Sequence, residues 1–116
     1  MGMHIDRSFS GTTDAAGVVP LYFTALPDHL QTAETAVENV LTEDTPFKTM
    51  SVQIGGTATV TLQGTAGDPD DAAQWFDIGS VSSSDIVTSS IQTRYIRANV
   101  TSYTSGDVDV QISVSE

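Results

Sequence analysis

The sequence predicts an all-β protein: a single antiparallel β-sandwich, jelly-roll or immunoglobulin-like, with an extended N-terminal arm and room for one short helix. Apolar and polar residues alternate over short runs, most regularly over residues 107–114. Clusters of Gly, Ser and Asp separate these runs at roughly the 8–12-residue spacing of a sandwich. The length of 116 residues suits one domain.

Residues 1–25 are expected to form the arm, and residues 26–116 the sandwich domain. Residues 1–16 are polar and weakly patterned, and Pro20 restricts the apolar run 18–25 to an edge strand or an arm. Residues 28–41 leave two interpretations open. Their apolar spacing and an N-cap at Asp28 favour a helix, whereas their threonines and Val-rich end favour a strand plus a loop.

The clearest strand signals lie in the second half of the chain. Residues 49–54 and 57–63 alternate on either side of Gly55-Gly56, which predicts a hairpin with its apolar side inward. An acidic loop (64–73) precedes two short predicted strands, 74–78 and 85–91, with polar residues 79–85 between them. Residues 94–100 and 107–114 predict a final hairpin about a Ser-Gly-Asp turn.

Two arginines stand three apart in the last of these segments. On a strand they face opposite sides, so they do not form one clamp for a ligand. We expect Arg97 on the solvent or interface face beside Tyr95, and Arg94 at the start of the strand with its stem over apolar surface.

Aromatic residues supply the candidate interface. Trp75 and Phe76 are adjacent and face opposite sides of a strand, so one is expected in the core and the other at the surface. An exposed aromatic surface suits a protein interface or sugar stacking. The candidate interface residues are Tyr22, Phe23, Phe47, Tyr95, Arg97 and Tyr103.

Charge narrows the choice of partners. Four Lys and Arg residues against 15 Asp and Glu give a formal charge of −11. Such a surface repels nucleic acids and anionic membranes, and it suits a salty environment that screens its self-repulsion. The start, MGMHIDRSFSG, lacks the apolar segment of a secretory signal, so we expect synthesis in a host cytoplasm.

No motif for catalysis, a cofactor or a metal is found, and we expect a protein that is not an enzyme. There is no cysteine, no nucleophile elbow and no phosphate-binding loop. His4 and His29 are isolated, which favours surface positions. The carboxylates of the 68–77 segment lack the spacing of a calcium loop, so a solvated acidic loop is favoured over a cation site.

Three segments carry a resemblance to a known group of proteins: IGGTATVTLQGTAG, QWFDIGS and TRYIRANVTSYTSGDVDVQIS. Over residues 46–114 they resemble the small β-sandwich structural proteins of tailed bacteriophages and related viruses. The Tyr-Ile-Arg strand also occurs in discoidin-like sandwiches that bind sugars or lipids. The DPDDAAQW segment departs from the shorter Asp-Gly-x-x-Trp turn usual in the phage proteins.

The resemblance implies a virion component, most simply a capsid decoration (cement) protein. Such a protein docks on the major capsid protein, commonly as a homotrimer, and an N-terminal arm can extend a neighbour's sheet. The alternatives are a protein of the tail, neck or fibre, or a β-sandwich module that binds glycans or a host surface.

Overall fold

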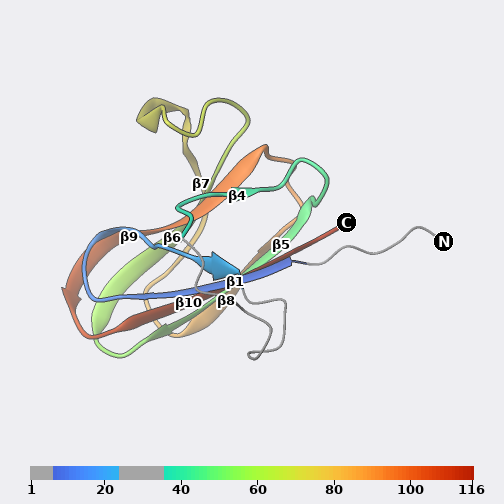
Figure 1. The fold of residues 1–116 in the computed structure, drawn as a ribbon. Coiled ribbons are helices and arrows are strands. Elements are labelled where there is room, and N and C mark those ends of the chain that lie inside the picture. Colours follow the sequence, from blue (N-terminus) through green and yellow to red (C-terminus); the bar gives the residue numbers. More distant parts are fainter. Residues whose placement is uncertain (1–6, 24–35) are drawn as a thin grey trace.

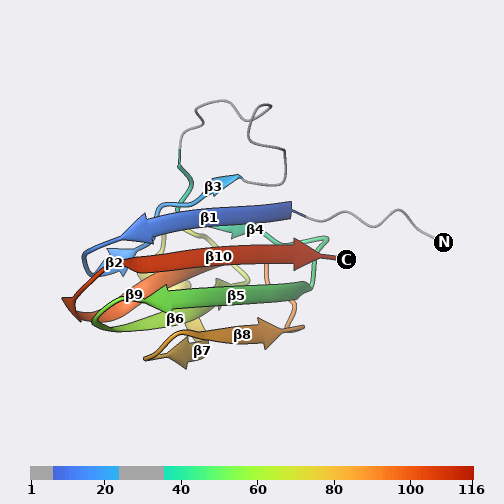
Figure 2. The ribbon, with the colours of Figure 1, turned by 90° about the horizontal axis from the view of Figure 1, so that it is seen from below.

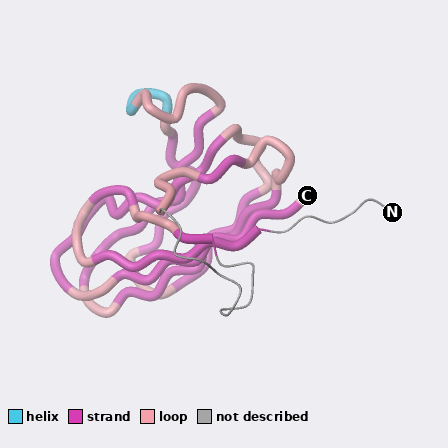
Figure 3. Tube along the Cα trace, in the orientation of Figure 1, coloured by secondary structure: helices cyan, strands magenta, loops and turns pink. Residues whose placement is uncertain are grey.

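The computed structural model describes residues 7–23 and 36–116, which form two antiparallel sheets packed face to face (Figures 1 and 2). This confirms the predicted all-β sandwich. Sheet A has the strand order β3-β1-β10-β5-β8, and sheet B has the order β2-β9-β6-β7, with β4 also paired to β9. The one short helix of the described residues is the 3₁₀ turn η2 (Ala72–Gln74), cyan in Figure 3. The strands are β1 (Arg7–Thr13), β2 (Gly17–Val18), β3 (Tyr22–Phe23), β4 (Val40–Leu41), β5 (Phe47–Ile54), β6 (Thr57–Thr65), β7 (Phe76–Val81), β8 (Asp85–Ser89), β9 (Tyr95–Ser105) and β10 (Val108–Ser115).

The core lies between the two sheets and is built by the alternating apolar residues. Each β10 side chain that faces inward is almost fully buried, as are most of the inward side chains on β5, β6 and β9. A fully buried aliphatic side chain stabilises a fold by about 1.5–3 kcal/mol. The four inward side chains of β10 are Val108, Val110, Ile112 and Val114.

The two predicted hairpins are wrong in their pairing, although their strands are present. β5 belongs to sheet A and β6 to sheet B, and β9 and β10 are divided between the sheets in the same way. Each pair is therefore joined by an arch that crosses the core. The amide of Gly55 donates to the carbonyl of Asp107 at 2.9 Å, which places both arches at one end of the sandwich. Alternation fixes which side of a strand faces the core, but a hairpin and an arch share that pattern.

The part of the expected arm that the structure describes, residues 7–23, lies within the sandwich. β1 pairs with β10 over its whole length and with β3 on its other side. The apolar alternation of β1 is weak in the sequence because Gly11 occupies one of its core-facing positions. A Cβ on Gly11 would come 2.0 Å from the carbonyl oxygen of Pro20, so the close packing there requires glycine. Residues 1–6 of the arm, with His4, lie outside the described residues.

The segment 28–41 lies mostly outside the described residues, including His29. From residue 36 onward the chain is extended, since Val37 forms a bridge with Leu21 and β4 pairs with β9. Nearer the tryptophan, the predicted strand 74–78 is displaced. Trp75 follows η2, and β7 runs from Phe76 to Val81. β8 matches the first part of the strand predicted over 85–91.

Candidate functional site

Large apolar side chains remain exposed at one end of the sandwich, opposite the two arches. We call this surface the apolar end. The ladders place the start of β5 beside the end of β8, and the starts of β7 and β9 beside the end of β6. The exposed fractions of its members are 42% for Leu41, 53% for Phe47, 70% for Phe76 and 60% for Ile91. These exposed apolar side chains share one end of the sandwich, which makes that end a candidate interaction site.

Cationic side chains hold the segments that carry this apolar end. Arg7 Nη2 donates to the carbonyl of Leu41 at 2.5 Å. Lys48 Nζ donates to the carbonyl of Pro46 at 2.7 Å and also to that of Ile91. Lys48 points between the sheets with only 2% of its surface exposed, and this burial lowers its pKa. The backbone beneath Leu41 and Ile91 is therefore fixed before any partner binds.

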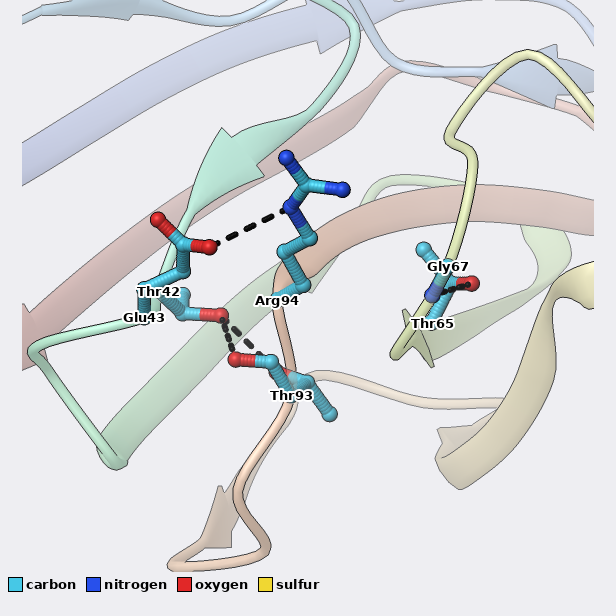
Figure 4. Close-up of polar contacts among 6 residues, drawn as sticks. All are labelled: Thr42, Glu43, Thr65, Gly67, Thr93 and Arg94. Carbon is cyan, nitrogen blue, oxygen red and sulfur yellow. Dashed lines mark hydrogen bonds and ion pairs between the residues drawn. The ribbon is translucent and has the colours of Figure 1, made fainter.

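At the same end, polar contacts join the segment after β4 to the segment before β9 (Figure 4). The Thr42 hydroxyl lies 2.8 Å from the Thr93 hydroxyl and donates to the Thr93 carbonyl at 3.0 Å. Arg94 Nε forms an ion pair with Glu43 at 3.2 Å, and both side chains are about half exposed. An exposed ion pair of this kind contributes roughly 0–1 kcal/mol, so the buried threonine contacts hold the two segments more than the ion pair does.

The loop between β6 and β7, which carries Trp75, covers part of the outer face of sheet B. Trp75 is 8% exposed, yet it packs against this outer face and not between the sheets. The Arg97 guanidinium lies 4.2 Å from the Trp75 ring centroid, and Arg97 Nε donates to Gln63 Oε1 at 2.9 Å. Gln63 Nε2 donates in turn to Asp77 at 2.9 Å. Burial lowers the pKa of Arg97, and the charge of Glu38 acts in the opposite direction.

The sequence did not indicate this contact of Arg97 with Trp75, because the loop that carries Trp75 folds back over the sheet. The carboxylates of that loop accept hydrogen bonds from backbone amides of the same loop. Asp68 accepts from the amide of Asp70 at 2.9 Å, and Asp71 caps η2 by accepting from the amide of Ala73 at 3.0 Å. Within residues 7–23 and 36–116, no group of three or more His, Cys, Asp or Glu residues could hold a metal ion.

The six candidate interface residues do not form one surface. Tyr22 and Phe47 lie on the outer face of sheet A, whereas Tyr95 and Arg97 lie on the outer face of sheet B. Phe23 lies at the edge of sheet A, edge-to-face with Phe9 at 5.6 Å. The Tyr103 hydroxyl donates to the carbonyl of Gly106 at 2.9 Å, beside the arches.

The outer face of sheet A is hollow and is lined mainly by hydroxyl and amide side chains. We call it the hydroxyl face. Its main groove has a volume of about 770 Å³ and crosses β1, β10, β5 and the start of β8, with Tyr22 and Ile86 among its lining residues. Two smaller hollows of about 500 and 220 Å³ continue along the same face. The polar residues of the face are Ser8, Ser10, Thr12, Thr49, Ser51, Gln53, Thr88, Gln111 and Ser113.

Comparison with known proteins gives a match in fold. No family model and no curated protein sequence matches the chain. A solved structure, that of the SPBc2 prophage-derived protein YomS, is similar with a TM-score of 0.62 and 12% sequence identity. The similarity covers 100% of this chain and 97% of that chain. In the described part of the chain, no helix has the length and apolar character to cross a membrane. The chain thus shares its two-sheet fold, over its full length, with a protein of prophage origin.

Proposed function

We propose that this protein is a structural component of a phage particle and that it acts by contact, not by catalysis. The observation that carries the proposal is the fold shared along the whole chain with a prophage-derived protein. The resemblance of residues 46–114 to phage β-sandwich proteins supports the same origin, although it concerns the layout of the fold more than a specific role. The formal charge of −11 favours a protein partner over a phosphate-bearing one.

In its specific form, the proposal is a capsid decoration protein that stabilises a head by docking on the major capsid protein and on copies of itself. The apolar end supports a docking role. Its side chains are exposed while the backbone beneath them is held by Arg7 and Lys48. A partner that covers Phe47 and Ile91 removes apolar surface from water without the cost of ordering these segments.

The test is the composition of particles produced by the genome that encodes this chain. Quantitative mass spectrometry of purified particles should find the protein in a fixed ratio to the major capsid protein, near one copy per capsid subunit. A few copies per particle would favour the neck, tail or fibre instead of head decoration. Absence from the particles would contradict both forms of the proposal.

A matched pair of variants tests the surface. Phe47→Ser with Ile91→Ser should lower the occupancy of the protein on particles, while Ile86→Ser should not. Ile86 is 58% exposed, which is close to the exposure of Phe47 and Ile91. It serves as the control because it lies toward the opposite end of the sandwich. Equal occupancy for all variants would exclude the apolar end as the docking surface. The mass of the purified protein in solution, measured by light scattering, tests the homotrimer separately.

A further inference from the structure

The main groove of the hydroxyl face has a low floor between two higher walls. Its floor is formed by the short side chains of Ser10 and Ser51 together with Gln111. Tyr22, 49% exposed, stands over β3 at one edge of the sheet, and Ile86, 58% exposed, stands on β8 at the other. At this position of sheet A, serines lie on the central strands β1 and β5, and Tyr22 and Ile86 lie on the edge strands β3 and β8.

The polar groups of this floor have no partner among the residues that the structure describes. Within residues 7–23 and 36–116, the side chains of Ser10, Ser51, Gln53 and Gln111 form no hydrogen bond to another protein group. The outer face of sheet B differs. There the hydroxyl of Thr61 lies 2.8 Å from that of Ser80, and the Gln63 amide is bonded to its neighbours. Among the described residues, the polar side chains named on sheet B are bonded to one another, whereas these four on sheet A are not.

The chemistry of the groove selects among ligand classes. Its lining includes the carboxylates of Asp85 and Asp109 and no lysine or arginine. Asp109 is also occupied, since it accepts from the Thr12 hydroxyl at 2.7 Å. An anionic ligand would meet like charge without a cation to pair with. A purely apolar ligand would bury hydroxyl and amide groups without replacing their hydrogen bonds to water.

We propose that this groove binds a chain of neutral sugars. A sugar chain offers hydroxyl donors and acceptors to Ser51, Gln53 and Gln111, and the apolar face of a sugar ring suits the exposed ring of Tyr22. The volume of about 770 Å³ is within the range of small-molecule sites, and the lining combines polar groups with one aromatic side chain. The site is separate from the proposed role in a particle and does not depend on it.

The test is binding of the purified full-length protein to a printed array of neutral and anionic glycans, followed by titration with the neutral oligosaccharides that bind. Saturable binding to at least one neutral glycan is expected. Tyr22→Ala should weaken that binding about tenfold, because it removes the aromatic wall. Ser51→Trp, which fills the floor, should abolish it.

Tyr95→Ala is the matched control, since it removes an aromatic side chain from the outer face of sheet B. It should bind the glycan as the unmodified protein does, and circular dichroism should show all three variants folded. If a variant fails to fold, shifts of the Ser51 and Gln111 amide resonances on adding sugar to the unmodified protein still locate the site by NMR. A shift confined to Trp75, which lies over the outer face of sheet B, would contradict it. Failure to bind any neutral glycan, preference for anionic glycans, or equal binding by Tyr22→Ala and Tyr95→Ala would overturn the proposal.

Discussion

Replacing Arg97 by alanine should destabilise the protein by about 2 kcal/mol. The guanidinium lies 4.2 Å from the ring centroid of Trp75, which is nearly buried, and a cation–π contact of this kind contributes about 1 kcal/mol. The hydrogen bond from Arg97 Nε to Gln63, 2.9 Å long, contributes about 1 kcal/mol more. Gln63 Oε1 keeps a second donor, Asn99 Nδ2 at 3.2 Å, so no buried acceptor is left unpaired.

Trp75 is the only tryptophan, so its fluorescence reports on this contact directly. Urea denaturation followed by fluorescence and by far-UV circular dichroism gives the free energy of unfolding from two signals. In Arg97→Ala, the Trp75 emission should shift toward that of exposed tryptophan before the strands unfold. The control is Arg94→Ala, whose exposed ion pair with Glu43 should contribute less than about 0.5 kcal/mol. A loss below about 0.5 kcal/mol in Arg97→Ala, with unshifted emission, would refute the reasoning.

Three further outcomes are expected. Gly106→Ala should cost about 2 kcal/mol more in urea denaturation than Gly17→Ala. Both glycines have positive φ, 87° and 117°, but only at Gly106 would a Cβ overlap backbone, 2.4 Å from the amide nitrogen of Gly56; equal costs would contradict this. Burial lowers the pKa of Lys48 below 10.5. As the pH rises, the folded protein therefore loses the Lys48 proton at a lower pH than the unfolded chain does. The free energy of unfolding relative to Lys48→Met should therefore rise as the pH increases toward about 10.5, and a flat difference would argue against a desolvated amine. The melting temperature should rise as NaCl increases from about 0.02 to about 0.5 M, because screening weakens the self-repulsion of a protein with charge −11; a fall would show that attractive ion pairs dominate.

The sequence predicted the strands and their inward faces well, because alternation depends on local chemistry alone. Val108 and Ile112 face the core as their positions indicate. Pairing was not predictable in the same way. Gly55-Gly56 is a strong hairpin signal, yet here it lets the chain cross between sheets, since the neighbouring arch at Gly106 packs against it. The partner of a strand depends on such distant contacts, which no local pattern records.

The exposure of the candidate interface residues was predictable only in part. Tyr22 and Phe47 are exposed as expected, because nothing in their neighbourhood covers them within the described residues. Arg97 was expected at an open face, but the Trp75 loop reaches back over it. The hydroxyl face was not recognised, since serine and threonine on the outer side of a strand read as ordinary solvent-facing residues. Its hollow shape arises from five strands side by side, of which the first and the last in the sheet are far apart in the sequence.

The pairing of β1 with β10 has a consequence for biosynthesis. β10 is the middle strand of its sheet, with β1 on one side and β5 on the other, so neither can complete its hydrogen bonds until β10 has left the ribosome. Until then, the nascent polypeptide carries threonine- and valine-rich strands with open edges, which are prone to aggregate. Such non-local topology also slows refolding in vitro. Premature termination before residue 108 would therefore yield an insoluble product, not a smaller working domain.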